Sequence, residues 1–203
     1  MDDIVKQALA KWPNVPDCYG WLGLDARGLW YMRDDRAQAA GAFASGLRGA
    51  KGSLLRHDKL IAFIERNYEA DARGRWFFQN GPQRVYVELE AAPWVWRVAD
   101  APGWPLTSHT GLPATPKACL LDEHGRLFLL TERGLGLVHS LDMPLAADAV
   151  EAGAWVPESV RFAELEARGG HVLRPVAKGE VSSSEAMPAA PEPRSPPGNR
   201  SGP

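Results

Sequence analysis

The chain has 203 residues, 45% of them hydrophobic, and a formal net charge of −2 at pH 7, which is typical of a globular protein with a substantial core. Binding of nucleic acid through electrostatics usually requires a basic surplus, so we expect no nucleic-acid partner. No apolar run approaches the roughly 20 residues of a membrane-spanning helix, and Met1–Lys6 lacks the features of a secretory signal. We therefore expect a cytoplasmic protein with no membrane partner.

The first elements are a helix and a pair of strands. Apolar residues recur at helical spacing over residues 3–12, and Pro13 ends that run. Residues 18–24 then predict a strand, and residues 29–33 predict its antiparallel partner.

The next stretch, residues 34–53, is rich in Ala and Gly. Asp34 or Asp35 can cap a short helix over residues 36–44, but the glycines weaken it and indicate a mobile loop after it. Asp58 is then expected to cap a firmer helix, in which apolar residues lie along one stripe.

Three turns share the pattern D-x-x-G: Asp25–Gly28, Asp71–Gly74 and Asp122–Gly125. Asp at the first position of a type I turn accepts bonds from the backbone ahead, and Gly at the fourth supplies the positive φ of a G1 bulge. GTPases also contain D-x-x-G, but the nearest phosphate-loop candidate, Gly46–Ser53, has Gly where Ser or Thr must follow Lys. The pattern therefore predicts hairpins. A fourth match, Asp100–Gly103, is not followed by a strand signal.

The second hairpin turns again at Asn80–Gly81 into a strand with alternating apolar residues. Residues 94–98 predict a further strand, and residues 99–116, rich in Pro and Gly, predict an ordered loop. After the third D-x-x-G turn, residues 135–141 complete a meander.

The C-terminal part is expected to be more helical. Asp148–Glu151 has capping-box spacing, and residues 157–168 have Pro near their start and Gly after their end, as helices do. Residues 172–173 suggest a short strand. Residues 179–203 are rich in Ser, Pro, Ala and Glu, so we expect a disordered tail.

The recurrence of the hairpins raises the question of a repeat. The segments between them differ, one being Ala-rich and helical and the other containing strands and a Pro-rich loop. We therefore predict one α+β domain over residues 1–178. Its antiparallel meander sheet is built from D-x-x-G hairpins with a few helices packed on it.

The chemistry-bearing residues form no known catalytic or metal motif. Cys18 and Cys119 are isolated, so we expect two half-buried thiols and no metal or cofactor. His57 is expected to take part in helix capping, and His139 to be a hydrogen-bonded core or edge residue. His109 resembles a site residue most, because hydroxyl side chains flank it in a loop.

The sequence is unusually rich in tryptophan, with eight in total. Trp76, Trp94 and Trp96 lie in predicted strands close to arginines, including Arg84. Exposed rings beside arginines would suit a planar ligand or a peptide. Core packing is the favoured interpretation, and we expect at least one of Trp94 and Trp96 to be core. The candidate binding residues are Trp76, Arg84, Trp94, Trp96 and His109.

Three segments carry a resemblance to a known family: Trp12–Pro16, Gly20–Asp25 and Phe78–Val87. With these segments the chain resembles a proteobacterial family of unknown function over roughly residues 1–175. The resemblance implies a bacterial cytoplasmic protein and assigns no activity, cofactor or site residue.

Three function classes follow. The favoured one is a non-enzymatic accessory or binding protein that presents an aromatic-rich sheet and loop to a protein or peptide. The second is a small-molecule-binding protein with an aromatic-lined pocket. The third, least favoured, is an enzyme that uses the loop around His109.

Overall fold

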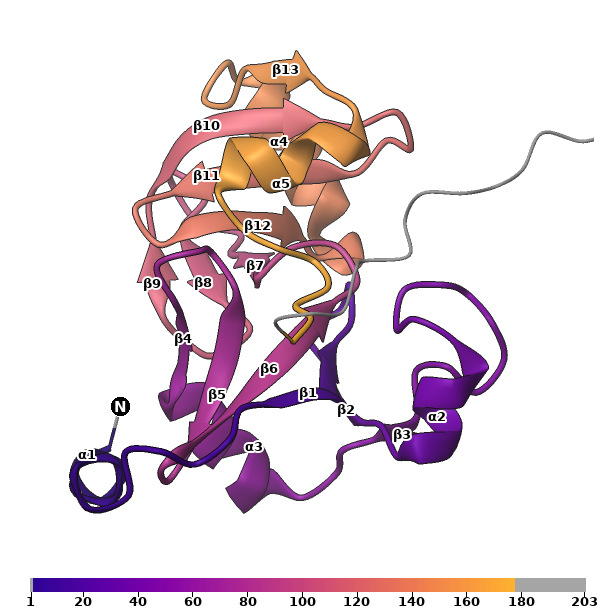
Figure 1. Cartoon of the computed structure of the whole chain (residues 1–203). Coiled ribbons are helices and arrows are strands. Elements are labelled where there is room, and N and C mark those ends of the chain that lie inside the picture. Colours follow the sequence, from indigo (N-terminus) through magenta and orange to yellow (C-terminus); the bar gives the residue numbers. More distant parts are fainter. Residues whose placement is uncertain (1, 178–203) are drawn as a thin grey trace, which may run out of the picture.

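The computed structural model describes residues 2–177, which form two β-sheets and a few helices (Figure 1). The first sheet has the order β3-β2-β1-β6-β5-β4. Its strands are β1 (Cys18–Leu24), β2 (Trp30–Met32), β3 (Ser53–Leu54), β4 (Tyr68–Ala70), β5 (Trp76–Asn80) and β6 (Gln83–Leu89). The tail predicted over residues 179–203 lies outside the described residues.

The second sheet has the order β13-β10-β11-β12-β7-β8-β9. Its strands are β7 (Trp94–Val98), β8 (Leu106–Ser108), β9 (Pro113–Ala114), β10 (Pro116–Leu121), β11 (Leu127–Thr131), β12 (Gly134–Val138) and β13 (Pro157–Ser159). The helices are α1 (Asp3–Lys11), α2 (Asp35–Ala40), α3 (Asp58–Arg66), η1 (Ser140–Asp142), α4 (Met143–Glu151), η2 (Phe162–Glu164) and α5 (Leu165–Gly169).

The two sheets repeat one topology. Raising each strand number of the first sheet by six gives β9-β8-β7-β12-β11-β10, which is the second sheet without β13. The expectation that the hairpins mark no repeat is therefore wrong. The repeat was hidden because α3 lies between β3 and β4 whereas β9 leads directly into β10. The loose match Asp100–Gly103 connects β7 to β8, as Asp25–Gly28 connects β1 to β2.

Both sheets are mixed rather than purely antiparallel. Strands β4–β6 and β10–β12 form the predicted antiparallel meanders. Each meander then pairs in parallel with the first strand of its own sheet, β6 with β1 and β12 with β7. Such parallel pairs require long crossover connections, which the local turn signals do not reveal.

The D-x-x-G turns have the predicted geometry. The Asp71 carboxylate accepts hydrogen bonds from the backbone N–H groups of Arg73 and Arg75 at 2.9 and 3.0 Å. Gly74 has a φ of 74°, in the left-handed region that favours glycine. The turns at Asp25 and Asp122 make the same pair of backbone bonds.

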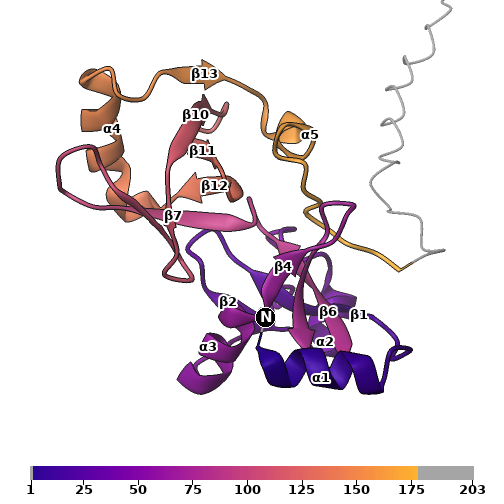
Figure 2. The ribbon, with the colours of Figure 1, turned by 90° about the vertical axis from the view of Figure 1, so that its left-hand side faces the viewer.

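One hydrophobic core joins the two sheets, with Leu24 and Leu89 contributed by the first and Trp96 and Leu129 by the second. A smaller cluster, which includes Leu165 of α5, covers the other face of the second sheet. Figures 1 and 2 show β7 at the junction, with the first sheet below it and β10, β11 and β12 of the second sheet above it. The chain is thus a single α+β domain, as predicted.

Three helix predictions need correction. Asp148, expected to begin a helix through a capping box, lies in the second half of α4, whose N-cap is Asp142. The N-cap of α3 is His57, whose Nδ1 accepts from the Leu60 N–H at 3.2 Å, and Asp58 is the first helical residue. The helix predicted over residues 157–168 begins instead as strand β13, which pairs in parallel with β10. Its apolar stripe is weak, so pairing with an open sheet edge outweighs helix formation there. Within this segment only residues 162–169 are helical.

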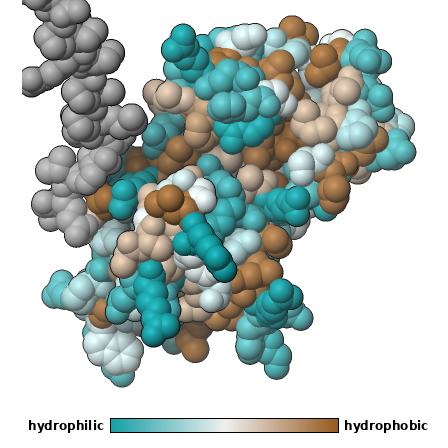
Figure 3. Space-filling view, turned by 90° about the vertical axis from the view of Figure 1, so that its right-hand side faces the viewer, coloured by the Kyte–Doolittle hydropathy of each residue, from teal (hydrophilic) through white to brown (hydrophobic). Residues whose placement is uncertain are grey.

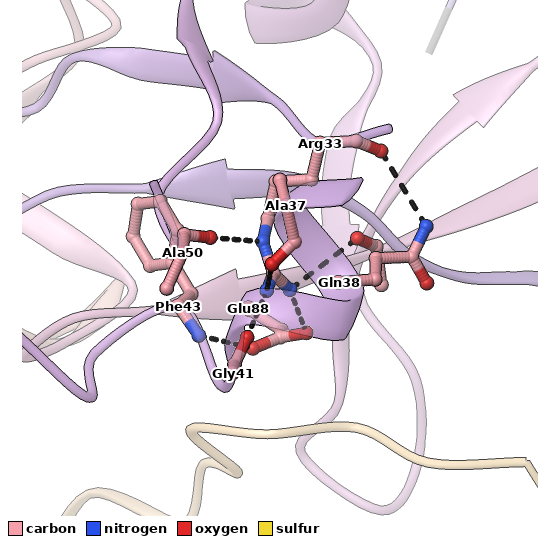
Figure 4. A network of polar contacts seen from close by, with 8 residues as sticks. Arg33, Ala37, Gln38, Gly41, Phe43, Ala50 and Glu88 are labelled. Carbon is pink, nitrogen blue, oxygen red and sulfur yellow. Dashed lines mark hydrogen bonds and ion pairs between the residues drawn. The ribbon is translucent and has the colours of Figure 1, made fainter. Parts of the chain in front are cut away.

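The segment expected to be a mobile loop is tied to the first sheet by a buried ion pair (Figure 4). The Arg33 guanidinium pairs with Glu88 and donates to the carbonyl oxygen of Ala50 at 2.8 Å. The second Glu88 oxygen accepts from the Phe43 N–H at 2.9 Å. Both charged side chains are buried, so each provides the opposite charge that the other needs in the absence of water.

None of the helices within residues 2–177 is long and apolar enough to cross a membrane. Cys18 is half-buried and Cys119 is buried, and both are free thiols.

Candidate functional site

The candidate tryptophans lie in the core. Trp76, Trp94 and Trp96 have exposed fractions of 8%, 5% and 0%. Their rings pack together, with the Trp94 centroid 5.0 Å from that of Trp76 and 5.9 Å from that of Trp96. The core assignment is therefore confirmed for both Trp94 and Trp96. Hydrophobic and hydrophilic groups are intermixed on the face shown in Figure 3.

Arg84 does not join these rings. Its side chain is exposed on β6, and its guanidinium lies 4.7 Å from the ring centroid of Phe77. The core tryptophans and Arg84 therefore contact different neighbours, and the sequence grouped residues that the fold separates.

His109 lies against the aromatic core and is held from the β7 backbone. Its ring centroid is 5.8 Å from those of Trp30 and Trp94 and 6.0 Å from that of Tyr68. Its N–H donates to the Val95 carbonyl at 2.8 Å, and its Nδ1 accepts from the Val95 N–H at 3.3 Å. Since Nδ1 is an acceptor, the neutral ring carries its proton on Nε2.

The electrostatic state of His109 follows from its burial. Removal from water disfavours the imidazolium and lowers the pKa of His109 to about 3. Its Nε2 is buried and has no hydrogen-bond partner within residues 2–177. His109 is therefore neutral near pH 7.

Next to His109, a hollow of about 420 Å³ opens between the sheets. We call it the inter-sheet hollow. Strand β2 and helix α3 contribute one side of it, and β7, β8 and the loop after β8 contribute the other. Its apolar lining consists of Leu29, Trp30, Leu55, Ile61 and Val95.

One end of the inter-sheet hollow is basic and rich in donors. Arg97 lies there, and Asp142 neutralises it through two bonds of 2.6 and 3.0 Å. Arg27 also lies there; its side chain is exposed and makes no hydrogen bond or ion pair within residues 2–177. This end thus holds one cation neutralised by a carboxylate and another with none.

His139 lies at the same end of the hollow. Its Nδ1 accepts from the Leu141 N–H at 3.1 Å, so the neutral ring carries its proton on Nε2. Burial lowers the pKa of His139, and the nearby positive charges of Arg97 and Arg27 lower it further. The ring is therefore a neutral hydrogen-bond donor near pH 7.

Glu65 of α3 lies on the other side of the hollow. Its carboxylate accepts from the Trp30 Nε1–H at 3.4 Å, and burial raises the pKa of Glu65. Within residues 2–177, no three or more His, Cys, Asp or Glu side chains are grouped so as to hold a metal ion.

The sequence identified only His109 among the polar residues of the hollow. Arg27 is a middle residue of a D-x-x-G turn, Glu65 lies in the helix expected after Asp58, and His139 was assigned to the core or an edge. Each comes from a different segment, and only the packing of the two sheets brings them together. A signal within one segment cannot reveal such a site.

The comparisons with known proteins place the chain in a family. The family model DUF2944, described as "Protein of unknown function (DUF2946)", matches residues 1–191. The chain belongs to this family. The expected resemblance to a family of unknown function is thus confirmed. No curated protein matches the chain.

Two solved structures are similar to this family member. One is a DUF1285 family protein from Silicibacter pomeroyi DSS-3, with 13% identity and a TM-score of 0.45, covering 73% of this chain and 84% of that one. The other is a DUF1285 family protein from Shewanella baltica OS155, with 15% identity and a TM-score of 0.43, covering 63% of this chain and 91% of that one.

Proposed function

We propose that this protein binds a small molecule in the inter-sheet hollow and that it does so as a bacterial cytoplasmic protein. The observation that carries the proposal is the composition of the hollow, in which an apolar wall faces a few convergent polar groups. Its volume of about 420 Å³ lies within the range of ligand sites, about 300–1,000 Å³. A ligand there would contact Trp30 on one side and His139 on the other.

Two other function classes receive less support. An aromatic platform for a partner would need exposed rings, and the three candidate tryptophans are buried. An enzyme using His109 as a general base would need a pKa near the working pH. With a pKa lowered to about 3 by burial, His109 is a weak base at pH 7. Binding without catalysis is therefore the favoured function.

One observation keeps a peptide partner as a second candidate. Leu29, Leu112 and Leu141 are large apolar residues with exposed fractions of 41%, 39% and 74%. Leu29 lines the hollow, Leu112 follows the lining residue Gly111, and Leu141 lies two residues after the lining residue His139. A peptide covering these leucines could place one side chain in the hollow, because exposed apolar groups often mark such contacts.

The proposal can be tested with N-phenyl-1-naphthylamine, an uncharged apolar probe that fluoresces when removed from water. We expect saturable binding by the full chain, lost in Leu55→Trp, where the larger ring fills the hollow. Val156→Trp is the matched control, because Val156 is 78% exposed and does not line the hollow. Equal binding by all three proteins would place the probe elsewhere and refute the proposed site.

A further inference from the structure

The repeat gives the two hollow histidines counterparts in the first sheet. Leu22 of β1 pairs with Met32 and Val87, and Trp96 of β7 pairs with Ser108 and Val138. Trp96 therefore takes the place of Leu22. Arg33 follows Met32, and His109 follows Ser108, so His109 takes the place of Arg33. In the same way Glu88 follows Val87, and His139 follows Val138, so His139 takes the place of Glu88.

The backbone confirms the first of these correspondences. The Arg33 N–H donates to the carbonyl oxygen of Trp21, the residue before Leu22, at 3.0 Å. The His109 N–H donates to the carbonyl oxygen of Val95, the residue before Trp96, at 2.8 Å.

In the first sheet these two positions neutralise each other. Arg33 and Glu88 form a buried ion pair, and the Glu88 carboxylate also accepts from the Phe43 N–H. The cation therefore has an internal carboxylate, and backbone carbonyls of the segment that follows β2 accept further bonds from the guanidinium (Figure 4). No further anion is needed at this place.

In the second sheet the corresponding residues are neutral histidines, each with its proton on Nε2. The nearby carboxylates already have partners, because Asp142 binds Arg97 and Asp25 accepts from the N–H groups of Arg27 and Leu29. Glu65 lies across the hollow, next to Trp30. The Arg27 guanidinium thus has no carboxylate partner within residues 2–177, although it lines the hollow beside His139.

Resting on the proposed function, we propose that the ligand of the inter-sheet hollow is an organic anion. Its acidic group is bound by Arg27 and the Nε2–H of His139, and its apolar body packs on Trp30, Leu55 and Ile61. The acidic group of the ligand supplies a negative charge to Arg27, as Glu88 supplies one to Arg33 in the first sheet. Hydrogen bonds from charged donors to a carboxylate or sulfonate are among the stronger ones in proteins, so the acidic group is expected to contribute strongly to affinity.

The apolar body contributes through burial. Leu55 and Ile61 are half-buried and pack against the core, so a ligand that covers them removes further apolar surface from water. The half-buried residues Leu55 and Ile61 and the basic end lie in the same hollow. This lining fits a molecule that has an acidic group at one end only. A highly charged polyanion would not match this lining.

The test compares two probes that share one aromatic body. 8-Anilinonaphthalene-1-sulfonate carries a sulfonate, and N-phenyl-1-naphthylamine does not. We expect the full chain to bind the sulfonate at least about tenfold more tightly, a difference in line with charge-assisted bonds. Arg27→Gln is expected to remove most of this preference, because the affinity for the sulfonate falls much more than the affinity for the uncharged probe. His139→Asn is expected to reduce the preference in the same direction.

Arg84→Gln is the matched control, since it removes the same charge on a side chain that does not line the hollow. The control is expected to bind both probes as the unmodified chain does. Equal affinity for the two probes, with both lost in Leu55→Trp, would overturn the anion inference and leave the proposed function standing. No binding of either probe would refute the proposed function, and the anion inference with it. A loss of sulfonate binding in Arg84→Gln as large as in Arg27→Gln would show general surface attraction and overturn the inference.

Discussion

The two sheets share one strand order but treat the same pair of positions differently. In the first sheet Arg33 and Glu88 form a buried ion pair that anchors the following loop. In the second sheet His109 and His139 are neutral and border an open hollow. The strand order is the same, but the two places differ in charge and in the connection beside them, which is residues 33–52 between β2 and β3 and residues 109–112 between β8 and β9. A built-in ion pair neutralises the first place, which borders a hollow of about 200 Å³, whereas neutral donors border the larger inter-sheet hollow at the second.

The largest effect is expected from breaking the pair in the first sheet. Glu88→Ala leaves the Arg33 guanidinium buried without a counter-charge, which should lower the free energy of unfolding by about 3–5 kcal/mol. Urea denaturation measures this. His139→Ala is the counterpart in the second sheet and should cost clearly less, because no charge is left unpaired. Similar costs for the two variants would remove the contrast between the sheets.

The two equivalent turns give a second comparison. Gly74 and Gly125 have φ values of 74° and 73°, so Ala strains both backbones alike. A Cβ at Gly74 would lie 2.0 Å from the Gly170 carbonyl oxygen, whereas a Cβ at Gly125 meets nothing within 4 Å. We expect about 1 kcal/mol for Gly125→Ala and about 1–3 kcal/mol more for Gly74→Ala. Equal melting temperatures would show that residues 170–172 do not pack firmly on this turn.

Acidification should weaken the fold through its buried histidines. Burial lowers the pKa of His171 to about 4 and that of His109 to about 3, below the usual 6.5. Between these folded values and 6.5 the unfolded chain binds more protons, so stability present above pH 6.5 is lost as the pH falls. Each histidine should contribute a slope of up to about 1.4 kcal/mol per pH unit.

Removing one of these histidines tests the slope. His171→Leu should flatten the dependence of unfolding free energy on pH between 6.5 and 4, because an apolar side chain replaces a ring whose two nitrogens lack partners within residues 2–177. His124→Leu is the control, since His124 lies exposed in a turn. An unchanged slope in His171→Leu would mean that His171 is accessible to protons in the folded state.

The smallest effect is expected at Arg27. Its side chain is exposed and bonds to no other side chain within residues 2–177, so Arg27→Gln should change stability by less than about 0.5 kcal/mol. Thermal denaturation measures this. A loss of several kcal/mol would assign Arg27 a structural role and remove it as a ligand group.

Local chemistry decided which features the sequence could predict. The strands at residues 18–24 and 94–98 agree with β1 and β7 because their signals, a Pro boundary and β-forming residues, lie within the strand itself. The D-x-x-G turns agree for the same reason. The strand at Pro157 was missed because its cause, the open edge of β10, is distant in the sequence.

The candidate site depended on the same distinction. His109 was identified from the hydroxyls beside it in the chain. The tryptophans were correctly assigned to the core by alternation, but the same alternation gave no hint of Arg27 or His139 as neighbours. Those residues meet only where β7 packs beside the first sheet. The repeat that relates His109 and His139 to Arg33 and Glu88 exists in strand order rather than in residue identity.

The central claim is that His139 is neutral with its proton on Nε2 and that it contacts the acidic group of the ligand. ¹⁵N NMR of histidine-labelled protein tests this claim most directly. At pH 7 we predict that His109 and His139 are both neutral with the proton on Nε2. Adding 8-anilinonaphthalene-1-sulfonate should shift the Nε2 resonance of His139 and leave that of buried His171 unchanged. A His139 proton on Nδ1, or a His139 resonance that stays fixed while the probe saturates the protein, would contradict the account.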